Sequence, residues 1–156
     1  MTRWPNPVRL LAAAWLIFTV AVYCRDIGRG FVRDDFTWIS AAQTAIAHPS
    51  TLIRPHEAGF YRPFVTLTFT LDYALHKWHS RGYGWTNLAL YAACASLIVR
   101  FAVVLGLDQR TAALSAFLWA VNPHGINMSV LWLSGRTALC LILFSVSATI
   151  AFIRQR

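Results

Sequence analysis

The stretch Phe31-Val-Arg-Asp-Asp-Phe36 is a polar island between apolar segments, and the predicted fold depends on where it lies. Acidic residues are scarce in this chain, with only 6 Asp and Glu among 156 residues, and two of the six are adjacent here. The pair, Asp34 and Asp35, comes soon after the first apolar segment. We therefore expect both carboxylates to lie at a membrane surface, where a lipid-borne substrate could reach them.

The composition on either side of this island is that of a membrane protein. Hydrophobic residues make up 57% of the chain and charged residues 13%, whereas soluble domains have about 45–50% apolar and about 25% charged residues. The apolar residues are concentrated in segments, which is typical of a polytopic membrane protein. The net charge of +8 comes mainly from Arg residues, most of which flank these segments. They indicate topology and contact with membrane lipid headgroups, and they lack the density of a nucleic-acid surface.

Four apolar segments are predicted to cross the membrane, so that residues 1–156 form a single all-α membrane domain. Arg110 lies in a short turn between two adjacent spans, and further Arg residues lie near both ends of the chain. The positive-inside rule then places the N-terminus in the cytoplasm. Pro123, within the third segment, should kink or end that helix. The predicted spans cover about 8–24, 83–105, 111–133 and 137–153, and a large outer loop covers 25–82.

Two amphipathic helices are predicted in the outer loop, and both should lie in the membrane interface rather than across it. The first covers 34–47 and ends before Pro49. The second begins near Pro63, a residue suited to the first helical turn, and the charge of Asp72 argues against a transmembrane position. Mostly apolar residues recur at helical spacing in both helices. They are Phe36, Ile39, Gln43 and Ile46 in the first helix, and Phe64, Leu67, Thr68, Leu71, Leu75 and Trp78 in the second.

Three polar features are candidate sites, and each keeps a structural alternative. Asp34 and Asp35 either cap the helix that follows, or hold a divalent cation, or supply a general base. The turn Tyr61-Arg62-Pro63 is either an ordinary turn or, together with the helix N-terminus behind it, an anion site. His124 and Arg136 lie in polar turns on the same predicted outer face, and they either line a cavity or belong to plain loops.

The order of these motifs along nearly the whole chain resembles a known family. The motifs are Arg33-Asp-Asp35, Tyr61-Arg-Pro-Phe64, Gly82-Tyr-Gly-Trp-Thr-Asn-Leu88, Phe117-Leu-Trp-Ala-Val-Asn-Pro-His124 and Ser129-Val-Leu-Trp-Leu-Ser-Gly-Arg136. The ordered set resembles the N-terminal part of membrane glycosyltransferases of the GT-C fold. It is most similar to transmembrane proteins that carry C-terminal tetratricopeptide repeats and are related to protein O-mannosyltransferases.

The resemblance implies an activity, a location and a set of roles. Such enzymes move a sugar from a polyprenyl-phosphate carrier to an acceptor hydroxyl, on a protein or a glycan, at the non-cytoplasmic face of the membrane. For this chain we expect the inner membrane of a bacterium, with the active face outside. Asp34 and Asp35 match the family's acidic residues, which act as a base or contact a divalent metal ion. The candidates for binding the phosphate or the substrate are Tyr61, Arg62, His124 and Arg136.

Two other function classes stay open beside the glycosyltransferase. Enzymes of the GT-C fold carry more than four spans, so we expect this chain to be an N-terminal portion that is inactive on its own. A small membrane scaffold or assembly protein without catalytic activity would fit the same architecture. A fragment of a transporter or channel, with Asp34 and Asp35 at an outer vestibule, is the third possibility.

Overall fold

The fold is described by a computed structural model that covers residues 27–54 and 61–155, with five further positions between 10 and 21. Within these residues the secondary structure is helical and contains no strand, which confirms the all-α prediction for this part of the chain. The predicted first span, 8–24, lies outside the continuously described residues. In chain order the elements are α2 (Asp34–Ala47), η1 (Pro49–Ile53), α3 (Pro63–His76), α4 (Ser80–Val104), α5 (Gln109–Ala120), α6 (Pro123–Ile126), η2 (Asn127–Leu131), η3 (Leu133–Gly135) and α7 (Arg136–Arg154).

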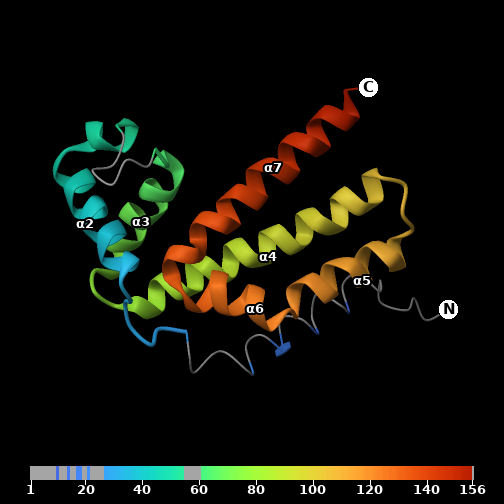
Figure 1. Cartoon of the computed structure of the whole chain (residues 1–156), viewed down its shortest axis with the longest axis horizontal. Coiled ribbons are helices and arrows are strands. Elements are labelled where there is room, and N and C mark those ends of the chain that lie inside the picture. The colour runs from blue at the N-terminus through green and yellow to red at the C-terminus, as the bar shows by residue number, and fades with distance from the viewer. Residues whose placement is uncertain are drawn as a thin grey trace.

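The helices α2 and α3 lie together at one end of the longer helices (Figure 1). The central element is α4, because both α5 and α7 pack along it. The pair is joined to this larger group in two ways. α3 packs against α4 and α7, and α2 packs against the short turn η3. The outer-loop helices and the polar turn before α7 are therefore neighbours in space, although they are far apart in the sequence.

Two helices in the described part of the chain are long and apolar enough to cross a membrane. They are α4 and the segment Leu133–Arg154, which contains α7, and they correspond to the second and fourth predicted spans. Four spans are not confirmed. The third predicted span, 111–133, is not one continuous helix, because α5 ends at Ala120 and a turn of π-helix, η2, follows the short α6.

The break in the third segment has a local cause. Asn122 lies between α5 and α6, and its Oδ1 accepts hydrogen bonds from the backbone N–H groups of His124 and Gly125, at 3.0 and 3.5 Å. Pro123 follows at the first position of α6, where its missing N–H costs no helical hydrogen bond. The side chain of Asn122 therefore starts a new helix at the position where the sequence predicts a kink or an end.

The predicted bounds of the first outer-loop helix and the predicted start of the second are confirmed, but most residues of the predicted stripes, Ile39 excepted, lie outside the packed faces. α3 buries Val65, Phe69 and Asp72, whereas Leu71 and Leu75 on a different face of the helix are 54% and 75% exposed. Both sides of α3 are apolar, so hydrophobic spacing does not identify the side that packs against protein. In α2 the buried residues include Trp38, Ile39, Ala42 and Ala45, while Phe36 and Ile46 are exposed.

Aromatic side chains connect α2, α3 and α4. The ring of Trp38 stacks on Phe69, with centroids 5.8 Å apart, and Phe69 also contacts Tyr83, with centroids 5.9 Å apart. All three side chains are buried, and Phe69 and Tyr83 are fully excluded from solvent. Burial of large rings and their mutual contact contribute about 0.5–1.5 kcal/mol per pair beyond area burial. This cluster holds the outer-loop pair against the N-terminal end of α4.

The turn between α4 and α5 is stabilised by local polar contacts. Gly106 adopts a φ of 89°, a conformation that L side chains rarely take. Asp108 then caps α5 by accepting hydrogen bonds from the hydroxyl of Thr111 and from the backbone N–H groups of Arg110 and Thr111. These bonds, chiefly that of the Thr111 hydroxyl, lower the pKa of the Asp108 carboxyl. The tight turn sets α5 antiparallel to α4, as the short predicted loop requires.

Gly135 offers a test of how closely the broken segment is packed. A Cβ atom at this position would overlap the backbone carbonyl of Met128. We expect Gly135→Ala to lower the free energy of unfolding by about 3 kcal/mol, since backbone in η2 would have to move. Thermal unfolding of the detergent-solubilised protein measures this loss.

The matched control is Gly125→Ala. A Cβ atom there would approach the Tyr91 hydroxyl only to 3.3 Å, so stability should change by less than about 1 kcal/mol. Equal melting temperatures for the two variants would contradict the close packing of η3 on η2.

Candidate functional site

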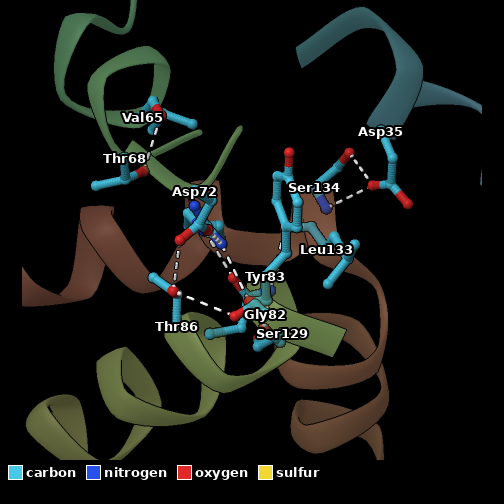
Figure 2. A network of polar contacts seen from close by, with 12 residues as sticks. Asp35, Val65, Thr68, Asp72, Gly82, Tyr83, Thr86, Ser129, Leu133 and Ser134 are labelled. Carbon is cyan, nitrogen blue, oxygen red and sulfur yellow. Dashed lines mark hydrogen bonds and ion pairs between the residues drawn. The ribbon is translucent and has the colours of Figure 1, made fainter. Parts of the chain in front are cut away.

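Asp35 is held inside the structure by three hydrogen bonds. Its side chain is 1% exposed, and one carboxylate oxygen accepts from the backbone N–H of Val32 at 2.8 Å. The other oxygen accepts from both the backbone N–H (2.8 Å) and the hydroxyl (2.5 Å) of Ser134 (Figure 2). Because Asp35 N–H also donates to the Val32 carbonyl, the turn before α2 is closed in both directions. Asp35 therefore ties the start of α2 to η3.

Asp34 differs from its neighbour in environment, although both lie in the first turn of α2. Its side chain is exposed, whereas that of Asp35 is buried. The preceding residue, Arg33, has a φ of 40°, which is strained for a residue other than glycine and costs about 1–3 kcal/mol. The hydrogen bonds of Asp35 on both sides of the turn offset this strain. The result is one carboxylate that anchors the turn and one that faces outward from it.

Arg136 lies in a buried polar network at the start of α7. Its side chain is fully excluded from solvent. Nη2 donates to a carboxylate oxygen of Asp72 at 2.5 Å and to the carbonyl of Tyr83 at 3.1 Å, while Nε donates to Oδ1 of Asn87 at 2.6 Å. The guanidinium also lies over the ring of Phe69, 4.3 Å from its centroid. Nη1 has no hydrogen-bond partner among the described residues. The hydrogen bonds to Asp72, Asn87 and Tyr83 offset the cost of removing the guanidinium charge from water.

Asp72 and Asn87 extend the network in two directions. The second carboxylate oxygen of Asp72 accepts from the hydroxyl of Thr86 at 2.7 Å (Figure 2). The amide nitrogen of Asn87 donates to the carbonyls of Ser129 and Leu133, at 3.0 and 3.1 Å. Both carbonyls belong to the interrupted segment between α5 and α7. Asn87 therefore supplies hydrogen bonds to backbone groups in the segment where regular α-helical pairing is interrupted.

The other candidate residues lie outside this network. Tyr61 is 59% exposed and Arg62 is half-buried at the start of α3, which no side chain caps. His124 is exposed on α6, which packs against α5 and η2 and not against α2 among the described elements. The structure therefore brings Asp35 and Arg136 together around η3 and leaves His124 elsewhere. The assignment of Tyr61, Arg62, His124 and Arg136 to phosphate binding stays a prediction.

A divalent metal ion at Asp34 and Asp35 stays a prediction. In the described residues, no group of three or more His, Cys, Asp and Glu side chains is placed to hold a metal ion. Both oxygens of Asp35 already accept hydrogen bonds inside the structure. Asp35 already uses part of its acceptor capacity within the fold, and the exposed Asp34 is the carboxylate more open to an ion.

Sequence reasoning missed Asp72, Asn87 and Ser134 as members of the site. Asp72 and Asn87 carried a usable signal. A charged or amide side chain inside an apolar helix needs a polar partner, and an ionisable residue there is a candidate for function. Their partner, Arg136, could not be paired with them from the sequence, because it follows Asp72 by 64 positions. Ser134 carried no such signal, since a serine in a turn is common.

The buried ion pair makes a stability prediction. We expect Asp72→Asn to lower the free energy of unfolding by about 3–5 kcal/mol, because it leaves the Arg136 charge buried without a counter-charge. The double variant Asp72→Leu with Arg136→Met should recover at least half of that loss, since it removes both charges. Thermal unfolding in detergent measures both. Asp108→Asn is the control, because it removes an exposed carboxylate. If Asp72→Asn lowered the free energy of unfolding no more than Asp108→Asn does, the structural role of the pair would be contradicted.

The chain is similar to three proteins that are each named as a protein O-mannosyl-transferase. It is 28% identical over 152 residues to the human protein O-mannosyl-transferase TMTC3, covering 87% of this chain and 16% of that protein. The mouse protein of the same name is 26% identical over 152 residues, with the same coverage. A protein O-mannosyl-transferase of Caenorhabditis elegans, F38B6.6, is 31% identical over 99 residues, covering 62% of this chain and 14% of that protein.

Comparison with families and structures adds no further match. No protein-family model matches the chain. No solved structure matches it either. The chain spans about a sixth of the length of the curated relatives it matches, 16% for both TMTC3 proteins. Over most of its own length, the chain is thus similar to protein O-mannosyl-transferases.

Proposed function

We propose that this chain is the part of a membrane glycosyltransferase that presents the catalytic carboxylate. The enzyme would move a sugar from a polyprenyl-phosphate carrier to an acceptor hydroxyl at the non-cytoplasmic face. The single observation that supports this is the division between Asp34 and Asp35, one exposed and one held by three hydrogen bonds. The names of the relatives favour mannose as the sugar and a protein as the acceptor.

Asp34 is the residue that we assign to chemistry. Its carboxylate takes the proton of the acceptor hydroxyl as that oxygen bonds to the anomeric carbon. The bond from the anomeric carbon to the phosphate oxygen breaks at the same time, and the polyprenyl phosphate leaves with the electron pair. A general base must lie within hydrogen-bond reach of the proton it takes. An exposed carboxylate on a turn that is fixed by its neighbour meets this need, since small misplacements cost large factors in rate.

The departing phosphate needs positive charge near it. Arg62 and the uncapped N-terminus of α3 are the best-placed candidates, because they lie closer to solvent than Arg136 does. Tyr61 is exposed and directly precedes Arg62, so it supplies a further polar contact. The full burial of Arg136 and its pairing with Asp72 favour a role inside the fold. No step of the proposed reaction requires a metal ion.

A scaffold without catalytic activity is the second candidate function. The observation that favours it is the structural use of two candidate residues, since Asp35 and Arg136 are both buried and paired. In a scaffold, Asp35 and Arg136 would contribute to stability alone, and the carboxylate of Asp34 would not be required for function. The substitution of Asp34 therefore separates the two candidates.

The catalytic assignment predicts different results for the two neighbouring carboxylates. Asp34→Asn should lower sugar transfer by about 10²–10⁴-fold, because the base is lost. Its melting temperature should stay near that of the unaltered protein, since the side chain is exposed. Asp35→Asn should lower the melting temperature as well as transfer, because Asn offers one acceptor oxygen where the carboxylate offers two.

The assay uses membranes from cells that express the protein from its complete gene. It follows labelled mannose from a synthetic polyprenyl-phosphate-mannose to a serine- and threonine-rich peptide. Asp108→Asn, at an exposed helix cap, is the control. Full transfer by Asp34→Asn would show that Asp34 is not the base. Absence of transfer by the unaltered protein would favour the scaffold.

The proposed orientation can be tested with engineered cysteines. Ser50 lies on the exposed turn η1 of the outer loop, and Asp108 lies on the exposed turn between α4 and α5. In a background with Cys24→Ser, Ser50→Cys should react with a membrane-impermeant maleimide added to intact cells. Asp108→Cys should react only after the membrane is permeabilised. The reverse pattern would place the outer loop in the cytoplasm and remove the proposed active face.

A further inference from the structure

We propose that Asn87 is a positioning residue for the turn that presents Asp34. It acts through the carbonyl of Leu133 and through Ser134, which in turn holds Asp35. The consequence for catalysis rests on the proposed function of Asp34. The mechanical part of the proposal, that Asn87 sets the order of the turn at 31–36, stands on the contacts alone.

The first link joins Asn87 to the interrupted segment. Its amide nitrogen donates to the carbonyls of Ser129 and Leu133, and its side chain is fully excluded from solvent. Ser129 and Leu133 are both buried, so the position of their carbonyls depends on the donor that the fold supplies. One amide group on α4 therefore fixes one backbone carbonyl in η2 and one in η3.

The second link fixes the direction of the Asn87 side chain. Arg136 Nε donates to Asn87 Oδ1 at 2.6 Å, so the amide oxygen faces the guanidinium and the amide nitrogen faces the two carbonyls. Arg136 is held in turn by Asp72, whose other oxygen accepts from Thr86. The amide cannot turn over without leaving a buried guanidinium N–H and two carbonyls unpaired, which is expensive.

The third link joins the interrupted segment to the candidate base. Ser134 follows Leu133 directly, and both its N–H and its hydroxyl donate to Asp35. Gly135 leaves no room between η3 and the Met128 carbonyl for a Cβ atom, so η3 packs closely on η2. A shift at Leu133 must therefore reach Ser134 and the turn that Asp35 closes. Asp34 lies on that turn.

The test uses hydrogen–deuterium exchange, which needs no substrate. Two variants are measured in detergent, Asn87→Leu and Asn87→Asp. The second keeps an oxygen for Arg136 but offers the carbonyls a carboxylate in place of an N–H donor, so it remains informative if the first fails to fold. We expect both to speed exchange of the 31–36 backbone about tenfold, with little change in α5. Asn127→Leu, on the same interrupted segment but exposed, is the matched control and should change neither region.

Exchange at 31–36 that equals the unaltered protein, in whichever Asn87 variant folds, would overturn the proposal. So would a rise of the same size in Asn127→Leu. A transfer assay with polyprenyl-phosphate-mannose then separates this proposal from the proposed function. Faster exchange together with a maximal rate at least tenfold lower, and an unchanged donor concentration for half-maximal rate, supports both. If the Asn87 variants exchange faster but the unaltered protein itself transfers no sugar, the result supports positioning and rejects the proposed function.

Discussion

The buried guanidinium of Arg136 is the constraint on which the rest of the described structure depends. A charge withdrawn from water needs a counter-charge and hydrogen-bond partners. Here the partners come from different helices, with Asp72 on α3 and both Asn87 and the Tyr83 carbonyl on α4. A planar guanidinium offers its donors in fixed directions, so it sets the relative positions of these elements together. Apolar packing around it, such as the ring of Phe69, cannot impose directions in this way.

This constraint explains why two adjacent carboxylates have different environments. Arg136 begins α7 and follows η3 directly, so fixing its side chain also fixes the turn that contains Ser134. Asp35 meets that turn and becomes buried, while Asp34, one residue earlier on α2, points to solvent. One carboxylate is thus used to hold the other in place. In the proposed function, this division positions the carboxylate of Asp34 without burying it.

The sequence predicts the bounds of α2, the start of α3 and the break after α5, because the signals for them are local. Pro63 marks the start of α3 and the Asn122-Pro123 pair marks the break after α5, each through its own backbone chemistry. The buried faces of α2 and α3 could not be predicted, because α3 is apolar on two sides and nothing local distinguishes them. The partners of Asp72 and Asp35 could not be predicted either. Each lies far along the chain, and pairing them requires the packed arrangement of the helices.

Three of the five motifs that carry the family resemblance meet in space. Asp35 belongs to the first motif and binds Ser134 in the last, while Asn87 in the third motif binds Arg136 in the last. A polar side chain in an apolar chain must find another polar group, so these motifs depend on one another physically. A substitution in one of these motifs leaves a buried hydrogen-bond donor or acceptor unpaired in the motif that it contacts. An ordered set of such motifs is therefore much stronger support for a shared fold than any one of them, because only a fold that brings them together satisfies them all.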